Sequence, residues 1–199
     1  MTFVTVGTQN FPFDRLLEMI DQLTGEGILQ GEVFAQTGYS SYAPKNYRHA
    51  DFLAPEDYNR AMEEADLIIA HAGVGTIMSA LSKGKKLIVV PRDPHFGEHV
   101  DDHQYEIAEE FARKGYLLCA KNRTELAAAL AEIPSITFQK YEKTGHTVDE
   151  KIENFLNGKQ HRVLMVGSDL SVKGGIVSVI RNLLGFDDWS TVDISFVPT

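Results

Sequence analysis

Short runs of β-branched and aliphatic residues alternate with longer amphipathic segments over the first two thirds of the chain. Alternating strands and helices form a parallel sheet with helices on both faces, so the pattern predicts a doubly wound α/β fold. The predicted strands are 2–6, 33–37, 67–70, 87–90 and 116–119. The predicted helices are 13–23, 56–64, 75–82, 100–113 and 124–132, the last with Thr124 as its N-cap. Ligands of such sheets bind beyond the carboxyl ends of the strands, so the loops there are the expected functional region.

Size and charge narrow the class of protein. The chain has 199 residues, 43% of them hydrophobic, and this is enough for a core that needs no metal or disulfide. Cys119 is the single cysteine, so no intrachain disulfide is possible, and its place in a predicted strand indicates an inert core thiol. The 28 acidic residues outnumber 19 basic ones, for a net charge of −9, which argues against a nucleic-acid partner.

The N-terminus and the apolar runs predict a protein on the cytosolic side. The opening MTFVTVGTQNFPFD has no basic region, and its apolar run stops at Gly7, so it does not resemble a secretory signal. No run approaches the roughly 20 apolar residues of a membrane-spanning helix. Attachment to a membrane is therefore expected only through a partner or a surface patch.

The composition changes near residue 140 and predicts a second unit. A polar segment, a weak helix ending at Leu156 and a short polar stretch lead into a strand, a Gly-Gly loop, a helix and another strand. Thirty-eight residues are too few to bury such a βαβ unit alone. The predicted domains are 1–157, a linker at 158–161, and an incomplete βαβ start of a second domain at 162–199, with strands at 163–166 and 192–197 and a helix at 176–184.

The most informative stretch is ADLIIAHAGVGTIMSAL, residues 65–81. A buried strand runs into the small-residue turn His71–Thr76 and then into a helix, whose first N–H groups and dipole attract anions. This pattern predicts a phosphate or diphosphate site, although the glycines could also serve only to make a tight turn. It is not a dinucleotide fingerprint, because Met78 stands where the last glycine is needed. It is not a P-loop either, because no Gly-Lys-Ser/Thr sequence follows.

A second glycine turn follows the first strand and should lie on the same edge of the sheet. It contains Gly7, Thr8 and Gln9, and the two polar side chains could hydrogen-bond a phosphate or an acceptor. The alternative is a simple strand-to-helix turn with polar capping.

The third constellation is PRDPHFGEHVDDHQYEIAEEF, residues 91–111, again after a buried strand. If it were wholly helical, His95, His99 and His103 would share a face and could bind a transition metal. Pro94 and Gly97 predict a loop at its start instead, so the favoured interpretation is a polar rim for sugar hydroxyls, without a metal. A solvated loop with acids at a helix N-terminus is the remaining alternative.

These motifs together resemble the glycosyltransferase family 28 C-terminal domain. The resemblance is carried by FVTVGTQNFPFDRLL, GYSSYAPKNY, ADLIIAHAGVGTIMSAL and VVPRDPHFGEHVDDHQYEIAEEFARKGY and covers residues 1–157. More narrowly, the chain resembles single-domain bacterial exopolysaccharide and capsule glycosyltransferase subunits, relatives of the catalytic subunit of the eukaryotic two-subunit GlcNAc transferase. The tail, 162–199, resembles the start of a family 4 glycosyltransferase.

The resemblance implies a Rossmann-like sheet that forms the donor half of a GT-B enzyme and binds a UDP-sugar. It places the diphosphate on His71, Gly73 and Thr76, with Gly75 allowing close backbone approach. It places the donor sugar on His103 and Gln104. Ser79 stands where relatives often carry a glutamate for the ribose, and serine offers one hydrogen bond in place of two.

The resemblance also implies a partner and a reaction. Transfer would go from a UDP-sugar to a polyprenyl-diphosphate-linked saccharide at the inner face of the membrane. A membrane-associated subunit would carry the acceptor domain and the base, so no catalytic residue is assigned in this chain, and no cofactor or obligatory metal is expected. One alternative is a non-catalytic nucleotide-sugar-binding or partner-activating subunit. The other is a sugar-nucleotide epimerase, which fits less well because such an enzyme needs both halves in one chain.

Overall fold

The computed structural model of the chain describes residues 1–141, 161–167 and 192–198. The chain divides into two compact units, Met1–Tyr141 and Glu142–Thr199. Within the described residues, none of the helices has both the length and the hydropathy needed to cross a bilayer.

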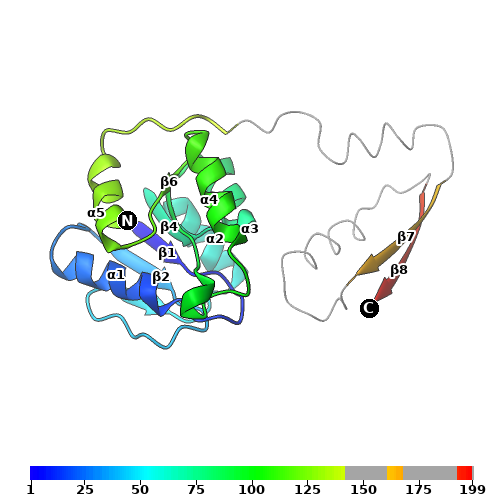
Figure 1. The fold of residues 1–199 in the computed structure, drawn as a ribbon, viewed down its shortest axis with the longest axis horizontal. Coiled ribbons are helices and arrows are strands. Elements are labelled where there is room, and N and C mark those ends of the chain that lie inside the picture. Colours follow the sequence, from blue (N-terminus) through cyan, green and yellow to red (C-terminus); the bar gives the residue numbers. More distant parts are fainter. Residues whose placement is uncertain (142–160, 168–191, 199) are drawn as a thin grey trace. The chain divides into compact units, whose positions relative to one another are not determined.

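The first unit is built on one six-stranded sheet in which every neighbouring pair is parallel (Figure 1). In sheet order, the strands are β3 (Arg48–Ala50), β2 (Val33–Gln36), β1 (Thr2–Thr5), β4 (Leu67–His71), β5 (Lys86–Val90) and β6 (Leu118–Cys119). The chain builds outward from β1 to β3 and then returns to place β4 on the other side of β1. This is the Rossmann order, in which the direction reverses between β1 and β4, and ligands bind in the crevice at that reversal.

Helices cover both faces of the sheet, as the alternating pattern predicts (Figure 1). They are α1 (Asp14–Gly25), α2 (Pro55–Glu64), α3 (Val74–Ser82), α4 (His103–Arg113) and α5 (Arg123–Glu132), with a short 3-10 helix η1 (Pro94–Phe96). On one face α1 and α5 pack against Val4 and Ile69, and on the other α2, α3 and α4 pack against Phe3 and Ile68. Because both faces are covered, the central strands are apolar at successive positions rather than at alternate ones.

The five strands and five helices expected in this unit are present, with three local differences. β3 was not predicted, because its sequence Arg-His-Ala has no aliphatic run and it lies at the exposed edge of the sheet. The N-cap of α5 is Asn122, not Thr124: the Asn122 side chain accepts the Glu125 N–H at 3.0 Å. α4 begins at His103 rather than at residue 100, because Asp102 is its N-cap.

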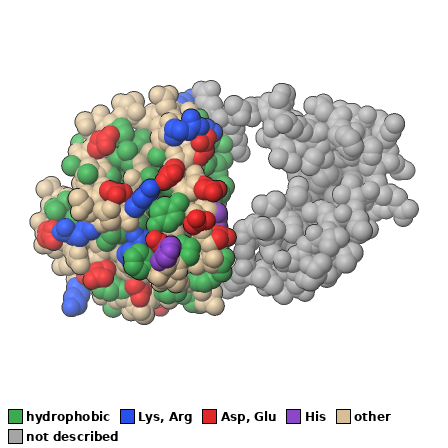
Figure 2. All heavy atoms as spheres, in the orientation of Figure 1, with side chains coloured by type: hydrophobic (Ala, Val, Ile, Leu, Met, Phe, Trp, Pro, Cys, Tyr) green, Lys and Arg blue, Asp and Glu red, His purple; other side chains and the backbone are tan. Residues whose placement is uncertain are grey.

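Charged side chains of both signs are interspersed on the face of this unit shown in Figure 2. Lys and Arg do not cluster there into one positive patch of the kind that binds a nucleic-acid backbone.

The second unit contains two described strands, β7 (His161–Gly167) and β8 (Val192–Pro198), which pair in parallel. They match the strands expected at 163–166 and 192–197. β7 begins at His161, which was expected to be the last linker residue. The rest of that linker, the weak helix ending at Leu156 and the helix at 176–184 lie outside the described residues, so the domain boundary stays a prediction.

Candidate functional site

The turn from β4 to α3 presents uncapped backbone N–H groups at the carboxyl edge of the sheet. β4 ends at His71, and Gly73 is the N-cap of α3 with no side-chain capping bond. The first intrahelical bond runs from the Ile77 N–H to the Gly73 carbonyl at 3.0 Å, so the N–H groups of Val74, Gly75 and Thr76 precede it. Val74 and Gly75 are exposed. The positive end of the helix dipole is therefore open to a ligand.

The His71 imidazole lies in a slot between two glycines that belong to different loops. A Cβ on Gly73 would stand 2.2 Å from His71 Nε2, and one on Gly7 would stand 2.5 Å from His71 Cε1. Gly7 also has φ +81°, in the left-handed region that favours glycine. The ring thus joins the loop after β1 to the turn after β4 at the point where the strand order reverses. We call these three residues the imidazole slot.

Gly75 differs from the two glycines of the imidazole slot. A Cβ there would meet no heavy atom within 4 Å, and its φ is not positive. The space beside Gly75 is open, as close approach of a ligand to the helix N-terminus requires. The structure therefore assigns Gly7 and Gly73 to packing and leaves Gly75 facing free space.

His71 is held as a neutral imidazole. It is 8% exposed, and burial together with the positive charge of Arg92 lowers its pKa to about 4. Its Nδ1 is buried without a hydrogen-bond partner among the described residues. At neutral pH the residue therefore offers a hydrogen-bonding ring, and the positive potential of the site comes from the α3 terminus and from Arg92.

Two further residues predicted for the nucleotide lie on α3. Thr76 and Ser79 are partly buried and three residues apart, so they share one side of the helix. The Tyr58 phenol of α2 is buried, which raises its pKa, and the nearby hydroxyls of Thr5 and Thr76 oppose that rise. Thr76 thus lies close to α2. Thr8 and Gln9 are exposed in the loop after β1, next to the imidazole slot.

Arg92, to which sequence reasoning assigned no role, is the second residue of the loop between β5 and α4, and its guanidinium binds four backbone carbonyl groups. Its side chain is 0% exposed. Nη1 donates to the carbonyls of Phe11, Pro12 and Glu98 at 3.0–3.1 Å, and Nη2 donates to the Val6 carbonyl at 2.7 Å. Burial lowers its pKa to about 10, so it stays charged at neutral pH. This one guanidinium ties the loop after β1 to the loop after β5.

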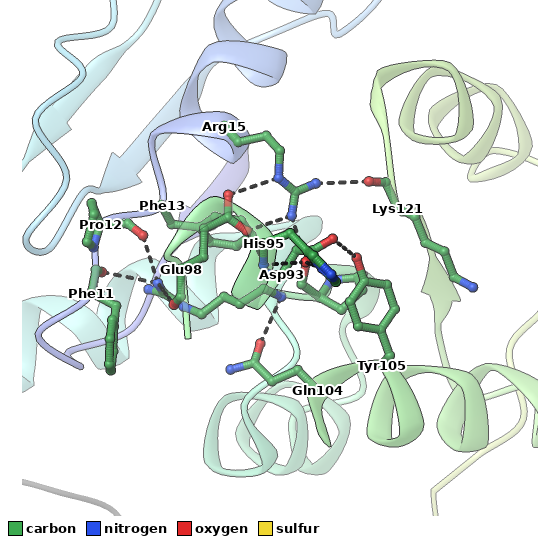
Figure 3. A network of polar contacts seen from close by, with 12 residues as sticks. Phe11, Pro12, Phe13, Arg15, Asp93, His95, Glu98, Gln104, Tyr105 and Lys121 are labelled. Atoms are coloured by element: carbon green, nitrogen blue, oxygen red, sulfur yellow. Dashed lines mark hydrogen bonds and ion pairs between the residues drawn. The ribbon is translucent and has the colours of Figure 1, made fainter. Parts of the chain in front are cut away.

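A second arginine supports the same loop from α1. Arg15 makes a two-pronged ion pair with the buried Glu98 carboxylate, at 2.9 Å from Nε and 2.8 Å from Nη2. Arg15 Nη2 also donates to the Pro91 carbonyl, and Nη1 donates to the Lys121 carbonyl, each at 2.9 Å (Figure 3). Glu98 also accepts the Asp93 N–H at 2.9 Å. The loop after β5 is therefore fixed by charged side chains, in contrast to the glycine packing at the turn after β4.

The three histidines at four-residue spacing do not share one helical face. Gly97, at φ +69°, ends η1, and only His103 lies in α4. His95 is 91% exposed and pairs with Asp93 at 2.8 Å. The buried His99 packs on the Phe11 ring and meets His103 edge to face, with centroids 4.7 Å apart. The loop predicted from Pro94 and Gly97 is confirmed.

Gln104, predicted to reach a donor sugar, is only 2% exposed. Its side-chain oxygen accepts the Arg92 N–H at 3.2 Å, and its amide nitrogen points away from that contact (Figure 3). His103, in contrast, is about half exposed, and its Nδ1 contacts Asp101. His103 is therefore accessible to a ligand. The side-chain oxygen of Gln104 is occupied by its bond to the backbone of the loop after β5, and only the amide nitrogen is left for a ligand.

Comparisons with known proteins agree with this geometry. The model of the glycosyltransferase family 28 C-terminal domain matches residues 1–161. A curated relative from Mus musculus, "UDP-N-acetylglucosamine transferase subunit ALG13", is 31% identical over 124 residues, which are 58% of this chain and 10% of the relative. The Yarrowia lipolytica protein of the same name is 33% identical over 135 residues, 59% of this chain and 63% of the relative.

A bacterial relative and a solved structure extend the comparison. The "UDP-N-acetylglucosamine--N-acetylmuramyl-(pentapeptide) pyrophosphoryl-undecaprenol N-acetylglucosamine transferase" of Pseudomonas fluorescens is 34% identical over 134 residues, 61% of this chain and 36% of the relative. The chain thus spans about a tenth of the mouse relative and a third of the bacterial one. A crystal structure titled as the glycotransferase of kitacinnamycin superposes with TM-score 0.52 and 18% identity, covering 68% of this chain and 35% of that chain. That likeness concerns the fold, and it confirms the expected Rossmann-like half of a GT-B architecture.

Proposed function

Because the chain belongs to the glycosyltransferase family 28 C-terminal domain family, we propose that it is the donor-binding subunit of a UDP-sugar-dependent hexosyltransferase. The observation that carries the proposal is the imidazole slot, which sets an open helix N-terminus at the point where the strand order reverses between β1 and β4. A nucleoside diphosphate has the negative charge and the small phosphoryl oxygens that fit uncapped N–H groups. This proposal joins the sequence prediction to a specific geometry.

In the proposed complex, the diphosphate lies against the N–H groups of Val74, Gly75 and Thr76. The α3 dipole and the buried Arg92 charge favour the two negative phosphoryl groups, and the neutral His71 ring shapes the floor of the site. The same groups favour the UDP leaving group as its charge develops during transfer. This binding mode needs no metal at the diphosphate, so we propose that transfer has no obligatory metal and no cofactor.

The donor is proposed to be a UDP-hexose or UDP-N-acetylhexosamine. The relatives from mouse, Yarrowia lipolytica and Pseudomonas fluorescens all carry UDP-N-acetylglucosamine in their names, which supports that class of donor. His103 and Gln104 would contact the sugar, the latter through its amide nitrogen because its oxygen is engaged by Arg92. Ser79 would contact the ribose with a single hydroxyl.

The acceptor and the partner are proposed from the same relatives. The eukaryotic relatives are named as subunits, and the bacterial one names a pyrophosphoryl-undecaprenol acceptor. We therefore propose that a membrane-associated subunit supplies the acceptor site and the base, and holds this chain at the inner face of the membrane. The product would be a lipid-linked saccharide, with exopolysaccharide or capsule synthesis as the proposed context.

One observation favours a second candidate. Ser79 cannot hold both ribose hydroxyls as a carboxylate can, which favours weak nucleotide binding and a non-catalytic, partner-activating role. Transfer of labelled sugar from a UDP-sugar to a lipid-linked acceptor, with the partner subunit present, separates the two roles. A catalytic subunit loses transfer when His71→Ala removes the ring from the site, whereas an activating subunit retains it.

The direct test of the donor site is calorimetric titration of UDP and a panel of UDP-sugars into the full chain. Gly75→Ala places a methyl group in the open space beside the α3 terminus without meeting any protein atom, so it should weaken UDP binding at least tenfold and leave the fold intact. Ser82→Ala, at the exposed far end of the same helix, is the matched control and should bind as the wild type does. Absence of binding by the wild type, or equal binding by Gly75→Ala, contradicts the proposed diphosphate position.

A further inference from the structure

Two imidazoles and one carboxylate converge just before α4. His99 Nδ1 lies 3.1 Å from Asp101 Oδ1, and His103 Nδ1 contacts the same oxygen. One ligand atom from each of the three side chains lies within 4.8 Å of the others. This is a different set from the three histidines that the sequence spacing suggested, because His95 pairs with Asp93 and Asp101 takes its place.

The three groups differ in how firmly they are held. The His99 side chain is buried, and its ring packs on Phe11, so one imidazole is fixed in place. Asp101 and His103 are each about half exposed at the adjoining helix start, so their side chains can adjust. A site with one fixed ligand and two adjustable ones requires little reorganisation of the protein when an ion enters.

The hydrogen bonding around His99 depends on its tautomer. Nδ1 either donates to Asp101 Oδ1 at 3.1 Å or accepts the Asp101 N–H at 3.3 Å, and His103 Nδ1 contacts the same carboxylate oxygen. A metal ion binds deprotonated ligand atoms, so it would take the place of a proton shared between an imidazole nitrogen and this oxygen.

We propose that His99, Asp101 and His103 form a binding site for a divalent transition-metal ion of the Zn²⁺ class. Two imidazole nitrogens and one carboxylate oxygen suit Zn²⁺, whereas Mg²⁺ and Ca²⁺ prefer all-oxygen sites. Ligand atoms around a tetrahedral ion with bonds of about 2.1 Å lie about 3.4 Å apart. The three ligand atoms lie within 4.8 Å of one another, so an adjustment of the half-exposed Asp101 and His103 side chains closes the triad. Three protein ligands leave the fourth tetrahedral position for water or an oxygen of a bound anion.

The proposed metal site shares His103 with the proposed sugar contact, but its test uses no nucleotide, so its outcome is separate from that of the donor-site test. Zn²⁺ is titrated calorimetrically into the untagged full chain and into three variants. Asp101→Asn and His103→Ala each remove one ligand from the half-exposed part of the site. His95→Ala is the matched control, because it removes an exposed imidazole from the same loop outside the triad. Far-ultraviolet circular dichroism of each variant verifies its fold.

The wild type and His95→Ala are expected to bind one equivalent of Zn²⁺ with equal affinity. Asp101→Asn and His103→Ala should each bind at least about tenfold more weakly, since even outer-shell changes cost 10–100-fold. Co²⁺ should give visible d–d bands that disappear in the same two variants. The proposal is overturned if the wild type binds no stoichiometric Zn²⁺, if the two ligand variants bind as the wild type does, or if His95→Ala weakens binding as much as they do.

Discussion

The turn after β4 and the loop after β5 lie on neighbouring strands at the same edge of the sheet, yet they are held in place by different physics. The first is two residues long, Ala72 and Gly73, and is fixed by backbone packing against one neutral ring. The second runs from Pro91 to Asp102 and is fixed by buried charges, chiefly Arg92. Steric fit thus positions the N–H groups of the candidate site, and electrostatics position the rim around them.

The largest effect is expected at the charged loop. Arg92→Met removes the donor from four carbonyl groups and should lower the free energy of unfolding by about 4 kcal/mol, because buried acceptors are left without partners. Urea denaturation monitored by circular dichroism measures the loss. Arg113→Ala, which removes an exposed ion pair, is the control and should leave the midpoint unchanged. A small loss at Arg92 would show that electrostatics do not hold the rim.

The imidazole slot should make stability depend on pH. The folded pKa of His71 is lowered to about 4 from 6.5, so the unfolded chain binds the proton more readily, and stability falls as the pH drops from about 6.5 to 4. The full effect is on the order of 3 kcal/mol. His71→Asn should remove this component, visible when the unfolding free energies of the two proteins are subtracted at each pH. A difference that does not vary over this range would mean that His71 titrates normally.

A smaller change in stability is expected at the two glycines of the β4–α3 turn, with opposite signs, because Gly73 is packed against a ring and Gly75 faces open space. Gly73→Ala should cost about 2 kcal/mol, because its Cβ would overlap the His71 ring. Gly75→Ala should leave stability unchanged or raise it by less than about 1 kcal/mol, because alanine favours helix and meets no atom there. Thermal unfolding of the two variants tests both signs. Equal losses of stability in the two variants would contradict the conclusion that Gly73, and not Gly75, packs against the His71 ring.

The smallest effect is expected at the outer part of the charged loop. His95→Ala removes an imidazole that is 91% exposed, and its contact with Asp93 is screened by water. We expect no measurable change in the thermal unfolding midpoint. A clear fall in the unfolding midpoint would show that the stabilising network of charged side chains includes His95 as well as Arg92 and Glu98.

The turn after β4 could be predicted because its geometry is local. A buried strand, a run of small residues and a helix are contiguous in the sequence, and they place His71 and the α3 terminus without knowledge of distant contacts. The parallel sheet followed in the same way from alternating strands and helices. The edge strand β3 could not be predicted, because Arg-His-Ala owes its strand conformation to pairing with β2 and not to its own composition.

The loop after β5 was harder to predict because its contacts are distant in the chain. Arg92 follows a buried strand and looks like an exposed rim residue, yet its partners Val6, Phe11 and Pro12 lie 80 to 86 positions away. The one signal was the position of Arg92, a charged residue that directly follows a buried strand and Pro91. The local backbone of this loop was easier to predict: Pro94 and Gly97 indicated that the three histidines do not share a helical face, and the left-handed Gly97 does separate His95 from the later two.

The imidazole slot has a consequence for how this chain can vary over time. A side chain larger than hydrogen at either glycine collides with the ring, so such a change is accessible only after the ring has been replaced by something small. Replacement of the ring, in turn, removes the steric constraint at Gly73, whereas Gly7 stays constrained by its left-handed φ of +81°. Positions 71 and 73 should therefore covary, with the histidine changing before Gly73 in any lineage that abandons the slot, and Gly7 should outlast both.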